Sequence, residues 1–204
     1  MNSFFTADNH FDHDSILRHC KRPWLQPGDL DDRGKWVSQE IADARLEAMN
    51  EAMVDIWNKK VPARDSVVYI AGDFAWRDPD RWLGRLHGKK ILCIGNHDKK
   101  GLMTDKRSFT EVHQILERTI CGKWMVICHY PFASWSGSVH GSWNLFGHCH
   151  MRYVPRPGFL QQDIGVDGHN FEPWDEGELF AVMTPKEEAR QRMLAGETRR
   201  ELMA

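Results

Sequence analysis

The sequence lacks a long hydrophobic run and a strong excess of either charge. No apolar stretch approaches the ~20 residues that a membrane-spanning helix needs, and the opening residues Met1 to Asp8 turn acidic too soon for a signal peptide. The 27 Lys and Arg nearly balance 29 Asp and Glu, which excludes a strongly basic nucleic-acid-binding domain and an acidic disordered tail. We therefore expect a cytoplasmic protein with no membrane partner and no extended nucleic-acid partner.

Cysteines are few and unpaired in pattern, whereas histidine and tryptophan are plentiful. The five cysteines are odd in number and form no Cys-x-x-Cys pair, so we expect reduced thiols rather than a disulfide framework. The chain also has 11 His and 9 Trp among its 204 residues. We find no repeat or linker, and therefore expect one domain over residues 1–204.

In the first half of the chain, apolar segments alternate with helical patterns. Short apolar runs that stop at Asp or Gly predict buried strands over 3–7, 67–71 and 91–94. Apolar residues spaced as on one face of a helix predict an amphipathic helix over 36–57, and a shorter helix is expected over 80–86. This alternation predicts parallel strands joined by helical crossovers.

The second half is richer in strands. The segments 111–118 and 123–128 predict a hairpin, and short strands are expected at 143–146 and 162–166. Thr184-Pro185-Lys186-Glu187 has the form of a capping box with proline at the first helical position, which predicts a C-terminal helix from about residue 185. Together these elements predict a mixed α/β domain, with two packed sheets and helices outside.

Polar residues that bind metals well follow the apolar segments in five places. Aspartate and neutral imidazole suit borderline divalent cations such as Mn, Fe, Co, Ni or Zn. A glycine before such a residue lets the backbone turn sharply and approach a site closely. The five clusters are Asp8-Asn9-His10, Gly72-Asp73, Gly95-Asn96-His97-Asp98, Cys128-His129-Tyr130-Pro131 and Gly147-His148-Cys149-His150.

The spacing within these clusters favours shared ligation. Residues two apart in an extended segment point to one side, as expected for the Asp-x-His and His-x-His pairs. The clusters offer more ligands than one cation can take while keeping an open position, but two cations sharing a carboxylate can use them all. The candidate ligands are Asp8, His10, Asp73, Asn96, His129, His148 and His150.

Each cluster taken alone has an ordinary structural explanation. An Asp-x-His pair is often a surface or capping pair, and Gly-Asp after a strand is commonly just a turn. No turn requires the string Gly95-Asn96-His97-Asp98, however. The conjunction of five clusters at strand ends favours a site, because α/β folds place their sites there.

The set Asp-x-His, Gly-Asp, Gly-Asn-His-Asp, His and Gly-His-x-His resembles the motifs of the calcineurin-like metallophosphoesterase superfamily. The opening Asp8 to His13 is similar to that of its small, capless bacterial and phage branch. The resemblance implies a four-layer α/β/β/α sandwich, in which helices flank two mixed sheets. It implies a hydrolase that cleaves phosphodiester or phosphomonoester bonds of a small molecule or nucleotide, using a hydroxide that bridges two divalent metals (Mn, Fe, Zn, Co or Ni, with Mn favoured).

The same resemblance implies a role for each motif residue. One metal would be held by Asp8, His10, Asp73 and His150. The other would be held by Asp73, Asn96, His129 and His148, so that Asp73 bridges the two. Asn96 would also contact the substrate, and His97 would bind the phosphate and act as the catalytic residue that stabilises charge and protonates the leaving group.

The chain departs from the family's pattern after Asp73. The string Gly72-Asp73-Phe74-Ala75-Trp76 has a tryptophan where many relatives have an acid or second histidine that supports the catalytic histidine. Trp76 offers one N–H donor and no carboxylate. The superfamily's protein Ser/Thr phosphatases also carry an Asp-Arg-Gly string after that acid, and this string is missing here, so a protein phosphatase is disfavoured.

Residues around the motifs have less specific candidate roles. His13 could contact substrate or simply begin a helix. Trp135 could stack a base, which is worth ~1–3 kcal/mol, but packing of its own loop is the favoured interpretation. Cys149 is expected in the core. Basic residues that could supply phosphate affinity are Arg22, Arg77, Lys99 and Lys100.

Two other functions stay open at this point. A nuclease acting on nucleic-acid ends is one, although the near-neutral charge speaks against extended duplex binding. The other is a non-catalytic scaffold of the same fold that binds proteins. Relatives of that kind usually lose metal ligands, whereas this chain keeps all the candidate ligands above.

Overall fold

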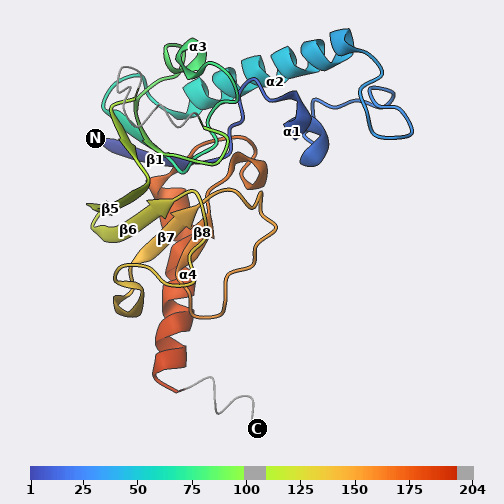
Figure 1. The fold of residues 1–204 in the computed structure, drawn as a ribbon. Helices are drawn as coiled ribbons and strands as arrows, with labels where there is room; N and C mark the ends of the chain where they lie inside the picture. The colour runs from blue at the N-terminus through green and yellow to red at the C-terminus, as the bar shows by residue number, and fades with distance from the viewer. Residues whose placement is uncertain (99–108, 197–204) are drawn as a thin grey trace.

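The computed structural model describes residues 1–98 and 109–196 and is built on two β-sheets (Figure 1). The first sheet contains β1 (Asn2–Thr6), β2 (Ser66–Ile70), β3 (Lys89–Cys93), β4 (Glu111–His113) and β9 (Trp174–Asp175), in the order β4-β3-β2-β1-β9. The second contains β5 (Ile115–Ile120), β6 (Lys123–Cys128), β7 (Trp143–Phe146) and β8 (Gln161–Asp163), paired in chain order. The α-helices are α1 (Asp14–His19), α2 (Gln39–Lys60), α3 (Pro79–Leu83) and α4 (Glu176–Leu194), and short 3₁₀ turns lie at Ser138–His140 and Val166–Gly168.

The first sheet has the predicted parallel centre. β1 pairs with β2 and β2 with β3 in parallel, while α2 and α3 lie in the connections between them. The expected parallel pairing with helical crossovers is therefore confirmed. Parallel strands end at the same edge of a sheet, so the loops that follow β1, β2 and β3 lie together.

Hydrophobic residues bury both faces of this sheet. On one face, Phe4 and Val68 pack with Met53 and Trp57 of α2. The helix begins where the predicted amphipathic pattern does, within three residues, because the Ser38 side chain accepts a hydrogen bond from the backbone N–H of Ile41 at 3.2 Å. Figure 1 shows α2 and α3 above this sheet.

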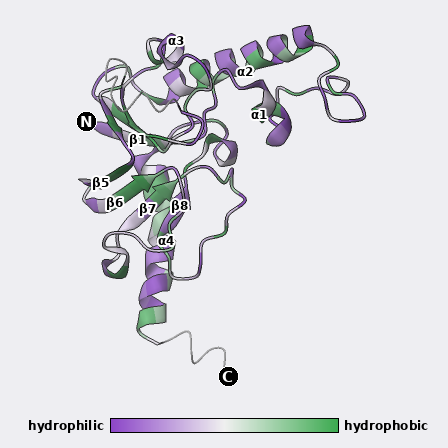
Figure 2. Ribbon diagram, in the orientation of Figure 1, coloured by the Kyte–Doolittle hydropathy of each residue, from purple (hydrophilic) through white to green (hydrophobic). Residues whose placement is uncertain are grey.

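The other face of the first sheet packs against the second sheet. Phe5 and Tyr69 share a buried cluster with Ile127 and Leu145. Leu179 and Met183 of α4 belong to the same cluster. Figure 2 shows β6 as hydrophobic and most of α4 as hydrophilic, as expected for a helix that buries one narrow side.

The predicted four-layer α/β/β/α sandwich is wrong. Since α4 shares the buried cluster between the sheets, it lies on the same face of the second sheet as the first sheet does. Loops cover the opposite face: the N–H of Phe132 donates to Asn144 Oδ1 at 3.2 Å, and the ring of Tyr153 meets Phe146 edge-on. No helix of residues 1–98 and 109–196 forms the fourth layer.

The winding of the second sheet explains this difference. β6, β7 and β8 follow one another in sequence and pair in parallel, and the described connections between them contain no α-helix. Their path resembles the stacked parallel coils of a β-solenoid. Parallel strands usually need helical crossovers, which the described part of this sheet lacks. The expectation of a helical layer outside it came from the resemblance to the metallophosphoesterase superfamily.

The hairpin and the last helix differ from expectation at their boundaries. β5 and β6 form the predicted antiparallel pair, but residues 111–113 leave it and pair with β3 in the first sheet as β4. The C-terminal helix begins at Glu176 rather than about residue 185, because its capping box is made by Asp175 and Glu178. Pro185 lies inside the helix.

None of the described helices is both long enough and apolar enough to cross a bilayer.

Candidate metal centre

The loops that follow five strands bring the candidate ligands together. Asp8 and His10 follow β1, Asp73 follows β2, and Asn96 follows β3. From the second sheet, His129 follows β6, while His148 and His150 follow β7. Asp8 joins the two sheets directly, since the backbone N–H of His148 donates to both of its carboxylate oxygens at 3.0 and 2.9 Å.

The backbone at these positions is strained. Asp8, His10, Asp73, His148 and His150 have φ values of 57°, 55°, 53°, 68° and 45°, the left-handed region that residues other than glycine rarely adopt. Each such residue costs about 1–3 kcal/mol, and strain of this kind gathers at functional sites. The predicted extended geometry of the two-apart pairs is therefore wrong, because tight left-handed loops turn these side chains inward instead.

Glycine is required where the loops approach one another. A Cβ atom on Gly147 would lie 2.6 Å from Ala7 Cβ and 2.7 Å from Asp8 Oδ2, both too close for real atoms. The glycine that precedes His148 therefore lets the β7 loop reach the carboxylate of Asp8, as the sequence predicted.

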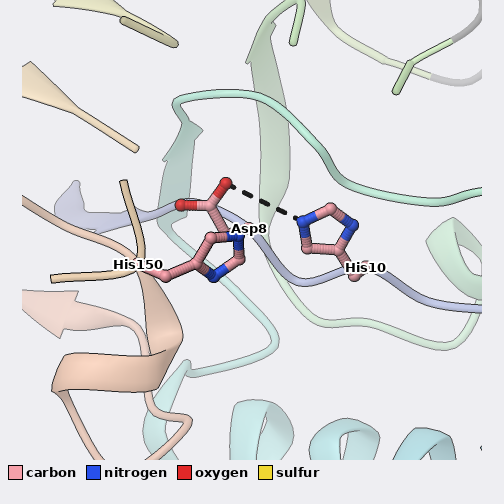
Figure 3. Close-up of side chains that lie close together, drawn as sticks. All are labelled: Asp8, His10 and His150. Carbon is pink, nitrogen blue, oxygen red and sulfur yellow. Dashed lines mark ion pairs between the residues drawn. The ribbon is translucent and has the colours of Figure 1, made fainter. Parts of the chain in front are cut away.

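The first group of ligand atoms comes from Asp8, His10 and His150 (Figure 3). One atom from each lies within 4.8 Å of the other two. His10 Nε2 lies 4.0 Å from Asp8 Oδ1, and the rings of His10 and His150 stack with centroids 5.3 Å apart. Asp8 and His10 are buried, so the group is largely shielded from water.

The second group comes from Asp73, His129 and His148, with Asn96 beside it. His129 Nε2 lies 3.3 Å from Asp73 Oδ2 and 3.0 Å from Asn96 Oδ1. His148 and Asn96 are exposed, whereas Asp73 and His129 are buried. This group therefore opens to solvent on one side.

Asp73 lies between the two groups. Its Oδ2 is 3.3 Å from His129 Nε2 and 3.6 Å from His10 Nε2. This is the placement that a shared carboxylate needs. The structure thus brings together all of the candidate ligands, and cation binding by them stays a prediction.

The donor chemistry fits divalent cations. His10 Nε2 is buried between Asp8 and Asp73 without a hydrogen-bond partner among the described residues, although such an atom costs free energy when left alone. His129 donates from Nδ1 to the carbonyl of Ala71 at 2.8 Å, so the lone pair of its Nε2 faces the oxygens of Asp73 and Asn96. Converging acceptors of this kind need a cation or a proton between them.

The pKa values of the candidate ligands agree with a cation or a proton lying between them. Burial raises the pKa of Asp8 to about 7. Burial would lower the pKa of His150, but its hydrogen bond to Asp167 and its closeness to Asp8 raise that pKa to about 10. Burial also lowers the pKa of His10 well below its usual range, which keeps this imidazole neutral and able to ligate. Cations would replace the proton on His150.

His97 lies beside the groups and not within them. Its backbone N–H donates to Asp73 Oδ1 at 2.8 Å, and its ring is 36% exposed with Nε2 4.0 Å from Asp73 Oδ2. The rings of Trp76 and His13 lie 4.9 and 5.6 Å from its ring, between centroids. Among the described residues, no carboxylate other than that of Asp73 is paired with His97.

Sequence reasoning missed Asp167, the partner of His150. His150 Nδ1 and Asp167 Oδ2 are 2.7 Å apart, while Arg22 holds both oxygens of Asp167 at 2.9 and 3.0 Å. Arg22 also donates to the carbonyls of Asp8 and Asn9. The role in phosphate affinity considered for Arg22 is wrong, because its side chain is fully buried and committed to these partners.

Two other interpretations made from the sequence concern Trp135 and Cys149. Trp135 is buried, donates to the carbonyl of Ser142 and packs on Phe159, so the packing interpretation is confirmed. Cys149 is only partly buried, so its assignment to the core is wrong. Lys99 and Lys100 lie outside the described residues.

Comparison with known proteins gives the fold alone. No family model matches the chain, and no curated protein does. A solved structure of a protein of unknown function, AQ665 from Aquifex aeolicus, is similar with a TM-score of 0.61 and 19% identity, over 89% of this chain and 98% of that one. The resemblance to calcineurin-like metallophosphoesterases therefore stays a prediction from the motifs.

Proposed function

We propose that this chain is a metal-dependent phosphoesterase of the calcineurin-like kind. The observation that carries the proposal is the position of Asp73 Oδ2 between His129 Nε2 and His10 Nε2, which is a buried nitrogen with no hydrogen-bond partner among the described residues. Two ligand groups on either side of one carboxylate are the arrangement that two-metal phosphoryl chemistry requires. When bound, two divalent cations, with manganese favoured, would polarise the phosphoester and lower the pKa of a bound water.

The protein's own groups would bind and orient the ester. Asn96 directs Oδ1 at His129, which leaves its amide nitrogen for a phosphate oxygen. The half-exposed ring of His97 can donate a hydrogen bond to the phosphate and pass a proton to the leaving oxygen. Its backbone contact with Asp73 holds this ring at the edge of the site.

The cell compartment is part of the proposal. All five cysteines are free. Reducing compartments keep thiols in that state, which supports action in the cytoplasm.

Turnover of p-nitrophenyl phosphate and of its bis ester by manganese-loaded protein tests the proposal. We expect turnover that a chelator abolishes. His97→Ala is expected to lower kcat by about 10²–10⁴-fold with metal content unchanged, because proton transfer is lost while the ligands remain.

His113→Ala is the matched control, since His113 is 31% exposed and pairs with Glu111 on β4. It should leave the rate unchanged. Full activity of His97→Ala would exclude the catalytic role, and two bound metals without any turnover would favour a non-catalytic scaffold.

A further inference from the structure

Trp76 is an exposed aromatic ring at the edge of the candidate site. Its side chain belongs to the motif that departs from the family's pattern, and nothing in the proposed chemistry uses it. Trp76 is 43% exposed, although its ring centroid lies only 4.9 Å from that of His97. Large apolar surface beside a catalytic group is a place to look for a ligand contact.

The ring is held in place before any ligand arrives. His13 stacks on Trp76 with centroids 4.1 Å apart and planes 10° from parallel. His13 is itself fixed by a 3.0 Å contact between its Nδ1 and that of His10. The backbone N–H of Trp76 donates to the carbonyl of Phe11 at 2.8 Å. His13 therefore covers one face of the indole. The part of the Trp76 ring that stays exposed is held in position by these contacts.

Most other tryptophans are too buried for a ligand to stack on them. Trp57, Trp82, Trp143 and Trp174 are buried, as is Trp135, the residue considered for stacking from the sequence. Trp124 is equally exposed at 43%, but it lies on β6 beside Gly137, away from the candidate ligands. Trp76 is thus the exposed indole that stands next to His97.

We propose that Trp76 is a stacking platform for a nucleobase, so that the substrate is a nucleotide phosphoester. This inference rests on the proposed phosphoesterase function. His97 lies near both residues, with its ring centroid 4.9 Å from that of Trp76 and its Nε2 4.0 Å from Asp73 Oδ2, so a ligand with its phosphate beside Asp73 and a planar group beyond it can reach the Trp76 ring. A nucleotide does this, because its sugar separates base from phosphate. Stacking tolerates any base, since each has a π face.

The test compares two esters with the same reacting bonds, adenosine 2′,3′-cyclic phosphate and the base-free ribose 2′,3′-cyclic phosphate. The proteins are wild type, Trp76→Ala, Trp76→Phe and the control Trp124→Ala, all loaded with manganese. We expect wild type to favour the nucleotide by about tenfold or more in kcat/KM. Trp76→Ala should lose that preference with its rate on the base-free ester within about twofold of wild type. Trp76→Phe should keep most of the preference, and Trp124→Ala all of it.

Calorimetric binding of adenosine monophosphate separates this inference from the proposed function. If no ester is cleaved but the nucleotide binds wild type about tenfold more tightly than Trp76→Ala, the stacking holds and the phosphoesterase proposal fails. Equal rates of wild type on the two cyclic esters, or an equal loss on both in Trp76→Ala, would overturn the stacking platform and leave the phosphoesterase proposal intact.

Discussion

At the scale of single residues, the centre depends on a buried arginine that no motif contains. Arg22 donates hydrogen bonds from two nitrogens to the carboxylate of Asp167, and it also donates to the backbone carbonyls of Asp8 and Asn9. Asp167 in turn faces His150 Nδ1, and Figure 3 shows the other ring nitrogen of His150 turned toward Asp8. A carboxylate placed behind a ligating imidazole fixes its tautomer and orientation, and so sets its affinity for a cation.

Asp167→Asn tests this arrangement. The amide removes the charge behind His150 and places an N–H group near Arg22 or the imidazole, so the ring loses its fixed orientation. We expect manganese to bind the first ligand group about 10–100-fold more weakly, measured by calorimetric titration.

Asp29→Asn is the matched control for that change. Asp29 is buried and holds Arg45 through two hydrogen bonds of 2.8 and 3.1 Å, in an ion pair of the same form away from the candidate ligands. It should bind manganese as wild type does. An equal weakening in both variants would show a general loss of stability, and unchanged affinity in Asp167→Asn would remove Asp167 from the centre.

Some residues of the candidate site can be located from the local sequence, and others cannot. Asp73 and His148 each follow a glycine after an apolar run, so chain order alone located them. Asp167 has no such mark, because its partners His150 and Arg22 are 17 and 145 positions away. Contacts over that separation are set by the fold, which the local sequence does not show.

At the scale of elements, the start of α4 shows how two capping signals compete. The sequence offers a capping box at Thr184 to Glu187, but Asp175 and Glu178 make the reciprocal hydrogen bonds, both at 2.9 Å. The box at Asp175 forms because β9 ends at this residue on the edge of the first sheet. A helix that begins there places Leu179 in the core. A proline at 185 is tolerated on the exposed side of the helix.

Asp175→Ala should therefore destabilise the protein. It removes the cap of α4 and the 3.1 Å ion pair with Lys60, so the free energy of unfolding should fall by about 1 kcal/mol in urea titration. Glu176→Ala, one residue later and outside the box, is the control and should cost less. If the two variants are equally stable, the cap contributes nothing.

The stability difference between wild type and Asp175→Ala should depend on pH. Burial raises the pKa of Asp175, but hydrogen bonds from the Glu178 backbone and Lys60 bring it below its ordinary value of 3.8. A carboxyl whose pKa is lower in the folded state contributes stability above its ordinary pKa and loses it as the pH falls through the folded value. The difference between wild type and Asp175→Ala should be full at pH 6 and shrink below about pH 4. A difference that grows on acidification would contradict this assignment.

At the scale of the whole molecule, two sheets meet so that loops from both form one centre. The parallel order β1-β2-β3 followed from alternating strands and helices, and so could be predicted from sequence. The place of α4 and the coil-like path through β6, β7 and β8 could not. Layer order depends on which face of a sheet each element covers, and similar hydrophobic patterns suit either face.

The shared centre ties the two sheets together, so cations should stabilise the entire fold. Asp8 already bonds to the β7 loop, and the first group combines Asp8 and His10 with His150. A ligand that binds only the folded chain raises its stability by mass action. Manganese should therefore raise the Tm, and a chelator should reverse the change.

The most direct measurement is the metal content of purified, manganese-loaded protein together with anomalous scattering from its crystals. Two equivalents per chain are expected, with peaks on the two sides of the Asp73 carboxylate, and Asp73→Asn should lose both. Protein that retains less than one equivalent, or peaks that lie away from Asp73, would contradict the proposed centre.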